Sequence, residues 1–306
     1  MQISKPYLLA LLACGLVFSS VTQGQEKSAT GVTLTTPTRV ALVGTYWESA
    51  NGKESPVLVL MHGEGGNRKK WKAIAGGLQK AGYAVLTLDM RKHGDSPGAA
   101  TDDVKGSKSK NDGNKLKAND YLAMIGDDME AVKVFLMEKH HAGELNVAKT
   151  GFVAIGAIGA VAINAAAMDW ARKDYPDGPP SARTPRGRDV KSVVLISPDS
   201  SVKGVKMMNG MKMTKAHGVN YLVVVGAKDK DKKKSAEKIV KSLRAGLKKD
   251  VKEEQVVLQT YDVRNNGENL VARDNLEFLK VLTQFHDRKL KTVNQPWRDR
   301  RSKLDR

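Results

Sequence analysis

The sequence predicts a single α/β domain with a mainly parallel central sheet covered by helices on both faces. Apolar runs rich in β-branched residues alternate along the chain with helical patterns. A chain of 306 residues with 41% hydrophobic content can bury a full core, and single α/β domains often reach that length. Alternation of strands and helices favours parallel pairing, with helices on each face.

The strand pattern occurs in runs at residues 39–47, 57–61, 84–88, 151–155, 192–196, 221–225 and 255–261. Helical patterns occupy residues 68–81, 120–140, 161–172, 235–247 and 269–286. The second of these is the plainest, because its apolar residues from Leu122 to Leu136 fall on one face, and Asn119 is its expected N-cap. We detect no internal repeat.

The N-terminus has the pattern of a secretory signal peptide, expected at residues 1–24. Lys5 precedes an apolar run at 7–18 that is too short to span a bilayer, and small or polar residues lead to a cleavage site near Gly24. We therefore expect export to the periplasm or the extracellular space. A retained anchor and a lipoprotein lipidated at Cys14 remain alternatives. Cys14 is the only cysteine, so no intramolecular disulfide can form.

The chain is strongly basic, with 51 Lys and Arg against 33 Asp and Glu, a formal net charge of +18. The excess is concentrated at 104–117, at 228–234 and in the segment 288–306, which we expect to be a solvated basic tail after a domain at 25–287. The near absence of aromatic residues there argues against a base-stacking nucleic-acid surface. An unknown small molecule or an anionic polymer is the expected partner, and plain solubility is the alternative. No second apolar run could span a membrane.

Three stretches resemble the α/β-hydrolase superfamily. "VLVLMHGEGGNRKKW" resembles its oxyanion-loop region, "AVLTLDMRKHGDS" its next strand and turn, and "YLVVVGAKDKD" the strand that carries its catalytic acid. The resemblance covers about residues 40–285, and the dienelactone-hydrolase-like and serine-aminopeptidase-like proteins are the most similar. It implies the α/β-hydrolase fold, with an oxyanion-loop-like segment at His62, Gly63, Glu64 and Gly65.

The same resemblance implies that the catalytic residues are substituted. In "GFVAIGAIGA" the small residues Gly156 and Ala160 flank Ile158, which we map to the nucleophile position and expect at the turn and the cleft floor. Asn266 stands before Gly267, where the family has a histidine, and Asp229 has the place of the acid. Asn266 cannot act as a general base near neutral pH. The resemblance thus indicates a pseudoenzyme that binds through a vestigial cleft or through its basic surface.

Other interpretations remain open. Asp229 also suits a helix cap, and His62 and His93 also suit loop-stabilising roles. An active serine hydrolase of the esterase or peptidase type would need a relocated nucleophile, for instance Ser197 or Ser200 in "SPDSS". The spacing of carboxylates and histidines suggests no metal site, and we expect no cofactor.

Overall fold

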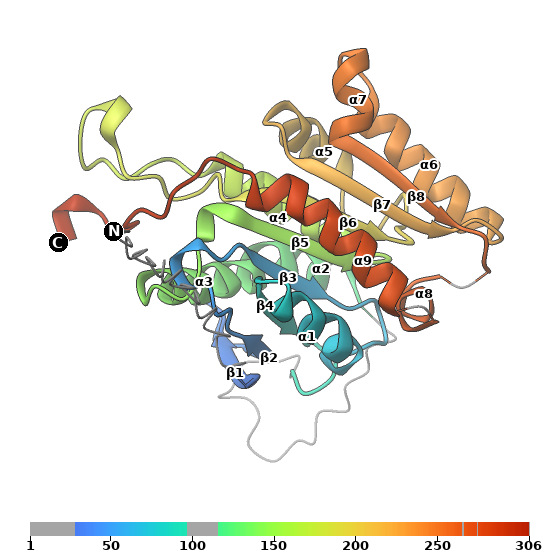
Figure 1. Ribbon diagram of the computed structural model, residues 1–306, viewed down its shortest axis with the longest axis horizontal. Coiled ribbons are helices and arrows are strands. Elements are labelled where there is room, and N and C mark those ends of the chain that lie inside the picture. The colour runs from blue at the N-terminus through green and yellow to red at the C-terminus, as the bar shows by residue number, and fades with distance from the viewer. Residues whose placement is uncertain (1–27, 97–115, 265, 274, 306) are drawn as a thin grey trace, which may run out of the picture.

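The computed structural model describes residues 28–96, 116–264, 266–273 and 275–305 (Figure 1). The expected signal peptide, Cys14 and most of the Lys-rich stretch at 104–117 lie outside the described residues. Export therefore stays a prediction.

The described part of the chain forms one sheet of eight strands: β1 (Thr30–Thr35), β2 (Ala41–Trp47), β3 (Val57–Met61), β4 (Ala84–Leu88), β5 (Thr150–Ile155), β6 (Val190–Ile196), β7 (Asn220–Gly226) and β8 (Val256–Tyr261). The strand order is β1-β2-β4-β3-β5-β6-β7-β8. β2 pairs antiparallel with both β1 and β4, and the remaining pairs are parallel. The parallel strands therefore have their carboxyl ends at one edge, where loops can bring side chains together.

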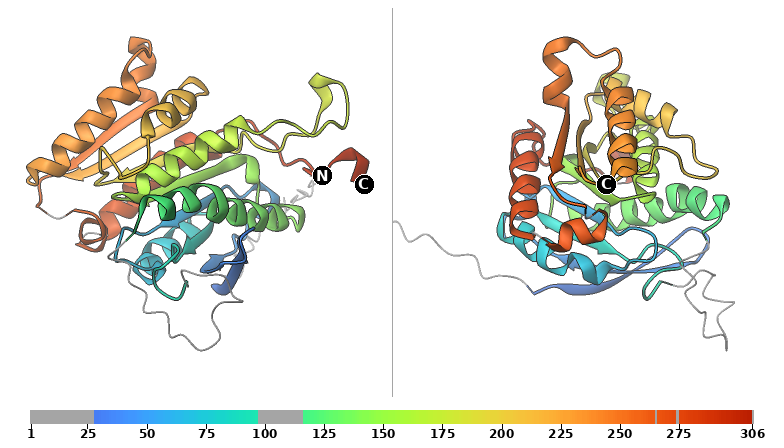
Figure 2. Two further views of the ribbon diagram at one scale, coloured as in Figure 1. Left: turned by 180° about the vertical axis from the view of Figure 1, so that it is seen from behind. Right: turned by 90° about the vertical axis from the view of Figure 1, so that its right-hand side faces the viewer.

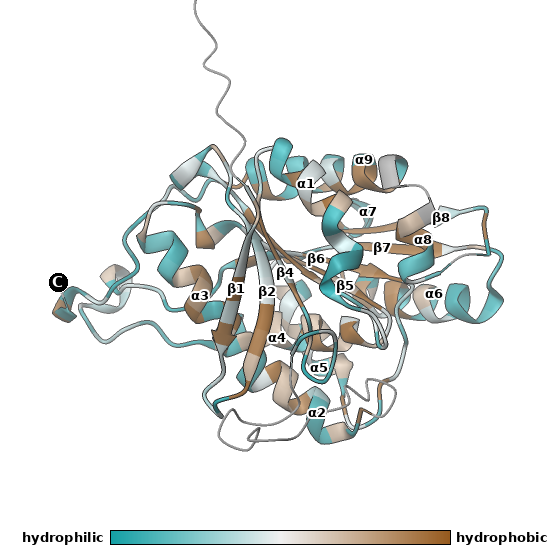
Figure 3. Cartoon of the chain, turned by 90° about the horizontal axis from the view of Figure 1, so that it is seen from below, coloured by the Kyte–Doolittle hydropathy of each residue, from teal (hydrophilic) through white to brown (hydrophobic). Residues whose placement is uncertain are grey.

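Helices cover both faces of this sheet (Figure 2). α1 (Lys72–Lys80) and α9 (Asn275–His286) pack on one face, with Trp71 and Phe278 among the largest buried side chains. The other face is covered by α3 (Met129–His141), α4 (Ile158–Ala171), α5 (Met207–Ala216) and α6 (Lys230–Arg244). In Figure 3 the strands in the middle of the sheet are brown and α6 is largely teal, as expected for an apolar core inside a polar surface.

The predicted fold class is confirmed, and the predicted strands agree closely with the structure. The runs at 57–61 and 84–88 coincide with β3 and β4, and the other predicted strands end within two residues of the observed ones. Three elements were missed: β1, α5 and α7 (Lys249–Gln255). β1 is an edge strand whose alternation is short, and the other two are short helices without a strong apolar period.

The helix predicted at 120–140 is divided in the structure. α2 (Ala118–Ala123) leads into a π-helical turn at Met124–Asp128, and α3 continues to His141. The expected N-cap at Asn119 is wrong, because the Asp120 carboxylate accepts the backbone N–H of Lys117 at 2.8 Å and the helix begins earlier. The π turn presents buried Asp128 to the Arg91 guanidinium at 2.9 Å.

The segment expected as a solvated tail is packed against the domain. Leu290 is fully buried, Trp297 stacks on His140 with ring centroids 4.9 Å apart, and buried Arg300 pairs with Asp189 at 2.7 Å. Figure 1 shows this red segment leaving α9 and passing beside the loop that follows α4. The segment is therefore not a solvated tail over this stretch, because apolar and ionic contacts fix the chain to the domain at least to Arg300.

Candidate functional site

A sharp turn joins β5 to α4, as the sequence predicts for a nucleophile elbow. The turn residue is Gly156, with φ of +59°, directly after the last strand residue. Its N–H donates to the Ile196 carbonyl at 2.9 Å, and its own carbonyl accepts from Gly159 at 3.1 Å. A left-handed backbone is readily adopted by glycine, which has no Cβ.

The expectation that Ile158 occupies this turn is wrong. Ile158 is the first residue of α4, is fully buried, and belongs to the core between the helices and the sheet. Its side chain therefore does not form a cleft floor. The turn lies two residues earlier because β5 ends at Ile155, and the next residue is the glycine that the left-handed conformation favours.

A carboxylate faces the place that a side chain at the turn would occupy. A Cβ built on Gly156 would lie 3.6 Å from Asp199 Oδ2, which is ordinary van der Waals contact. Asp199 follows β6, and its other oxygen accepts from Lys232 Nζ at 2.6 Å. The space at position 156 therefore admits a small side chain next to a negative charge, although the left-handed backbone would strain any residue other than glycine.

Asp229 and Asn266 lie together, as the mapping of the acid and histidine positions predicts. The Asp229 carboxylate caps α6 by accepting the Lys232 N–H at 3.0 Å. This bond lowers the pKa of Asp229, and a hydrogen bond from the Asn266 side chain contributes further. The structure thus supports the helix-cap interpretation of Asp229 and retains the neighbour relation of an acid and its partner.

Ser197 has an unusual backbone conformation and a hydroxyl that both donates and accepts a hydrogen bond. It follows β6 with φ of +46°, a conformation uncommon for residues other than glycine, and is 1% exposed. Its Oγ donates to Asn266 Oδ1 at 2.9 Å and accepts the Gly267 N–H at 2.8 Å. Asn266 Oδ1 also accepts the Gly226 N–H at 3.0 Å. Ser197 therefore joins the ends of three strands through Asn266.

His62 has the loop-stabilising role considered above. One ring nitrogen, Nδ1, donates to the Gly63 carbonyl at 2.7 Å, and Nε2 accepts the Met90 N–H at 3.0 Å. Burial lowers the pKa of His62 to about 4, so the ring is neutral near pH 7. The His93 ring lies 5.0 Å from it, and His93 Nδ1 bonds to the Arg91 carbonyl at 2.8 Å. These bonds tie the loops after β3 and β4 together.

The glycine-rich loop after β3 contacts carboxylates of the chain itself. A Cβ on Gly66 would collide with the Glu268 carboxylate, and the Gly63 N–H hydrogen-bonds to Glu268. Burial raises the pKa of Glu268. Glu64 accepts from the Tyr121 hydroxyl, and its pKa is raised first by burial and then by nearby Asp199. Three carboxyl groups, those of Glu64, Asp199 and Glu268, therefore gather near this edge of the sheet, with Lys232 and Lys70 close to them.

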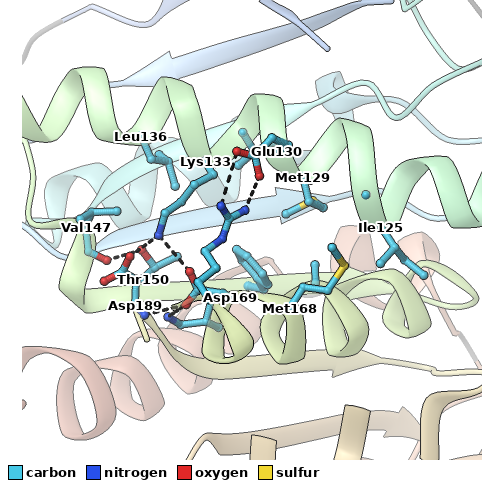
Figure 4. A pocket seen from close by; sticks show the side chains of 16 residues that line it. Ile125, Met129, Glu130, Lys133, Leu136, Val147, Thr150, Met168, Asp169 and Asp189 are labelled. Atoms are coloured by element: carbon cyan, nitrogen blue, oxygen red, sulfur yellow. Dashed lines mark hydrogen bonds and ion pairs between the residues drawn. The ribbon is translucent and has the colours of Figure 1, made fainter. Parts of the chain in front are cut away.

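Three cavities lined by described residues lie away from this turn. Figure 4 shows the one between α3 and α4, where Lys133 pairs with Asp169 at 2.9 Å and with Asp189, and Arg172 pairs with Glu130. Its volume of about 30 Å³ has room for about two water molecules. It is therefore a packing defect beside an ion-pair network, too small for an organic ligand.

Two features are absent from the part of the chain that the structure describes. No group of three or more His, Cys, Asp or Glu side chains there is arranged to hold a metal ion. Within the same part of the chain, no helix is long and apolar enough to cross a membrane.

Comparisons with known proteins agree with the architecture. Residues 56–147 match a family model described as alpha/beta hydrolase fold. An esterase of Pyrococcus furiosus is 16% identical, with a TM-score of 0.59 over 86% of this chain and 91% of that chain. A dienelactone hydrolase of Anabaena variabilis is 14% identical, with a TM-score of 0.54 over 87% of this chain and 100% of that chain.

The alpha/beta hydrolase GrgF of Penicillium is 12% identical, with a TM-score of 0.58 over 86% of this chain and 99% of that chain. A comparison with curated proteins found no match. At these identities the likeness concerns the fold, and the fold agrees with the strand order, the turn and the helical layers described above. This chain has the α/β-hydrolase fold.

Proposed function

We propose that this protein is an exported, non-catalytic protein of the α/β-hydrolase fold that binds an anionic ligand through its basic surface. The observation that carries the proposal is the glycine at the turn after β5. Covalent hydrolysis begins with attack by a side-chain oxygen or sulfur, and Gly156 has neither. Removing the serine alone lowers turnover about a millionfold in enzymes of this mechanism.

The surroundings of the turn support the same proposal. A hydrolase stabilises a developing negative charge with N–H donors near the nucleophile. Here the Gly63 N–H bonds to the Glu268 carboxylate, and the carboxylates of Glu64 and Asp199 lie nearby. Like charges repel, so a negatively charged intermediate is disfavoured at this edge.

A hydrolase that uses Ser197 is the second candidate, because Ser197 has positive φ directly after a strand, as an elbow residue does. Two observations weigh against it. The hydroxyl is buried, and its proton points to Asn266, an amide that does not accept a proton near neutral pH. Ser197 suits a structural hydrogen-bonding role better.

A row of lysines on α6 supports binding of anions. Lys230, Lys234, Lys238 and Lys241 are exposed, and their spacing places them along one face of the helix. Such a face attracts anionic polymers and small anions in a salt-dependent manner. A variant with these four lysines changed to Gln should elute from heparin at lower salt than a control with four scattered exposed lysines changed, namely Lys69, Lys72, Lys173 and Lys280. Equal elution of both variants would contradict a role for α6.

The catalytic part of the proposal is tested by rebuilding the missing groups. Native protein and Gly156→Ser should show only background turnover of p-nitrophenyl esters, because an unactivated serine is a poor nucleophile. Gly156→Ser with Asn266→His and Asp199→Asn would restore a serine and a histidine next to Asp229 and remove the adjacent charge. Weak turnover is expected only in this triple variant. Turnover by the native protein would contradict the proposal.

A further inference from the structure

A second cavity lies between the C-terminal segment and the loop that follows α4. Its volume is about 350 Å³, which is within the range of pockets that hold small molecules. Its lining includes Asn146 and Ala148, which precede β5, so it is near the amino ends of the parallel strands. Gly156 lies at the opposite end of β5.

The inner wall of this cavity is held by polar side chains that already hydrogen-bond within the protein. His140 is 1% exposed, with Nδ1 near the Leu145 carbonyl at 3.2 Å and Nε2 bonded to the Arg298 carbonyl at 2.8 Å. Arg300 is 5% exposed and bonds to Asp189 and to the Pro185 carbonyl at 2.8 Å. These groups hold the wall in place and have little capacity left for a ligand.

The two sides of the cavity are joined by Asp177. Its carboxylate accepts the Thr184 N–H at 2.9 Å from the loop and the Lys303 N–H at 3.0 Å from the C-terminal segment. Both backbones are therefore held at a defined separation, and side chains from each side line the same space.

Two arginine side chains on this lining, Arg183 and Arg298, form no ion pair with a carboxylate among the described residues, and Lys303 lies close enough to the Asp177 carboxylate to lower its pKa. Arg183 Nε donates to the Gly178 carbonyl at 3.1 Å, and Lys303 Nζ donates to the Ala182 carbonyl, so both side chains keep further N–H groups for a ligand. The acidic residue on the lining, Asp299, already pairs with Arg301 at 2.7 Å. The cavity therefore carries an excess of positive charge from both sides.

We propose that this cavity is a binding site for a compact anion with at least two negative charges, such as the phosphate groups of a small molecule or of a lipid headgroup. Arginine forks and a lysine suit phosphate oxygens, and donors from two segments can contact two charged groups at once. The bound anion bridges the loop and the C-terminal segment. The inference goes beyond the proposed function, since it assigns a site and a ligand chemistry far from Gly156.

The test is calorimetric titration of the full chain with pyrophosphate at low and moderate salt. Arg183→Gln with Arg298→Gln should weaken binding by at least about 10-fold, because each loses charge-assisted hydrogen bonds to the anion. The matched control, Arg264→Gln with Arg288→Gln, removes the same charge from exposed sites outside the cavity and should change binding by less than about 3-fold. Urea unfolding of both variants checks that they are folded.

Two results would overturn the proposal. One is equal loss in the cavity variant and in the control, which would mean diffuse attraction to a basic protein. The other is absence of binding by the native protein at about 1 mM pyrophosphate in low salt. Neither result bears on ester turnover or on the heparin elution of the α6 lysine variant, so failure here is distinguishable from failure of the proposed function.

Two further measurements, retention on vesicles and amide hydrogen exchange, extend this test. Retention on vesicles that contain phosphatidic acid, displaced by free pyrophosphate, supports a headgroup as the source, and pyrophosphate binding without retention supports a soluble ligand. Pyrophosphate should also slow amide exchange in residues 293–303 of the native protein and not of the cavity variant. Equal slowing in both would contradict bridging by this site.

Discussion

At the carboxyl ends of the parallel strands, Asp199 borders the space beside Gly156, and Glu64 and Glu268 lie at the neighbouring glycine-rich loop, whereas near the amino end of β5 the cations Arg183 and Arg298 line a cavity. The first region is where this fold places catalytic groups. The second is built by the C-terminal segment. The comparison suggests that a protein can retain the backbone of the site that its fold usually provides, while its charged side chains favour ligand binding at a different place.

The largest loss of stability is expected where the C-terminal segment packs against the domain. Arg300→Met removes a buried guanidinium from Asp189 and should lower the free energy of unfolding by about 3 kcal/mol, because a buried charge loses a partner. Urea unfolding measures it. Arg301→Met, an exposed position on the same segment, should leave the urea midpoint unchanged. Equal midpoints for the two variants would show that the segment is not fixed by Arg300.

A smaller loss of stability is expected at the edge of the sheet where the parallel strands have their carboxyl ends. Ser197→Ala removes the hydroxyl that joins Asn266 and the Gly267 N–H, and should cost about 2 kcal/mol because buried polar groups lose their partners. Ser200→Ala is the control from the same loop. If Ser197→Ala unfolds at the same urea concentration as this control, the hydroxyl does not organise the edge as described.

The smallest expected change in the free energy of unfolding is a gain, and it depends on pH. Burial raises the pKa of Glu268 in the folded protein, so its contribution to stability is present below its unfolded value and is lost as pH rises through the folded pKa. Glu268→Gln should therefore stabilise the protein near pH 7 by up to about 1 kcal/mol, and the gain should vanish below about pH 4. Thermal unfolding against pH measures it, with exposed Glu237→Gln as control. A gain that is constant across pH would contradict burial as its cause.

The sheet and its strand boundaries could be predicted from the sequence because buried parallel strands are nearly continuous apolar runs between turn residues. The acid and histidine positions, Asp229 and Asn266, could be placed together because they follow neighbouring strands. The turn was placed wrongly at Ile158, although the end of the apolar run at Ile155 and the glycine after it would have located it.

The charges around the turn could not be read from the sequence. Glu268 bonds to Gly63, about 200 residues away in the chain, and no local pattern indicates that contact. The packed C-terminal segment was missed for a similar reason. Its many basic residues suggest a solvated tail, whereas single long-range contacts of Leu290, Trp297 and Arg300 hold it in place.

We infer that neither the turn nor Ser197 provides an activated nucleophile. The most direct measurement is labelling of the pure protein by a fluorophosphonate, followed by mass spectrometry of the labelled peptide. We expect no labelling of the native protein, because Gly156 has no side chain and the Ser197 hydroxyl is buried and donates to an amide. Stoichiometric labelling that Ser197→Ala abolishes and Ser200→Ala leaves intact would contradict it and identify an active serine hydrolase.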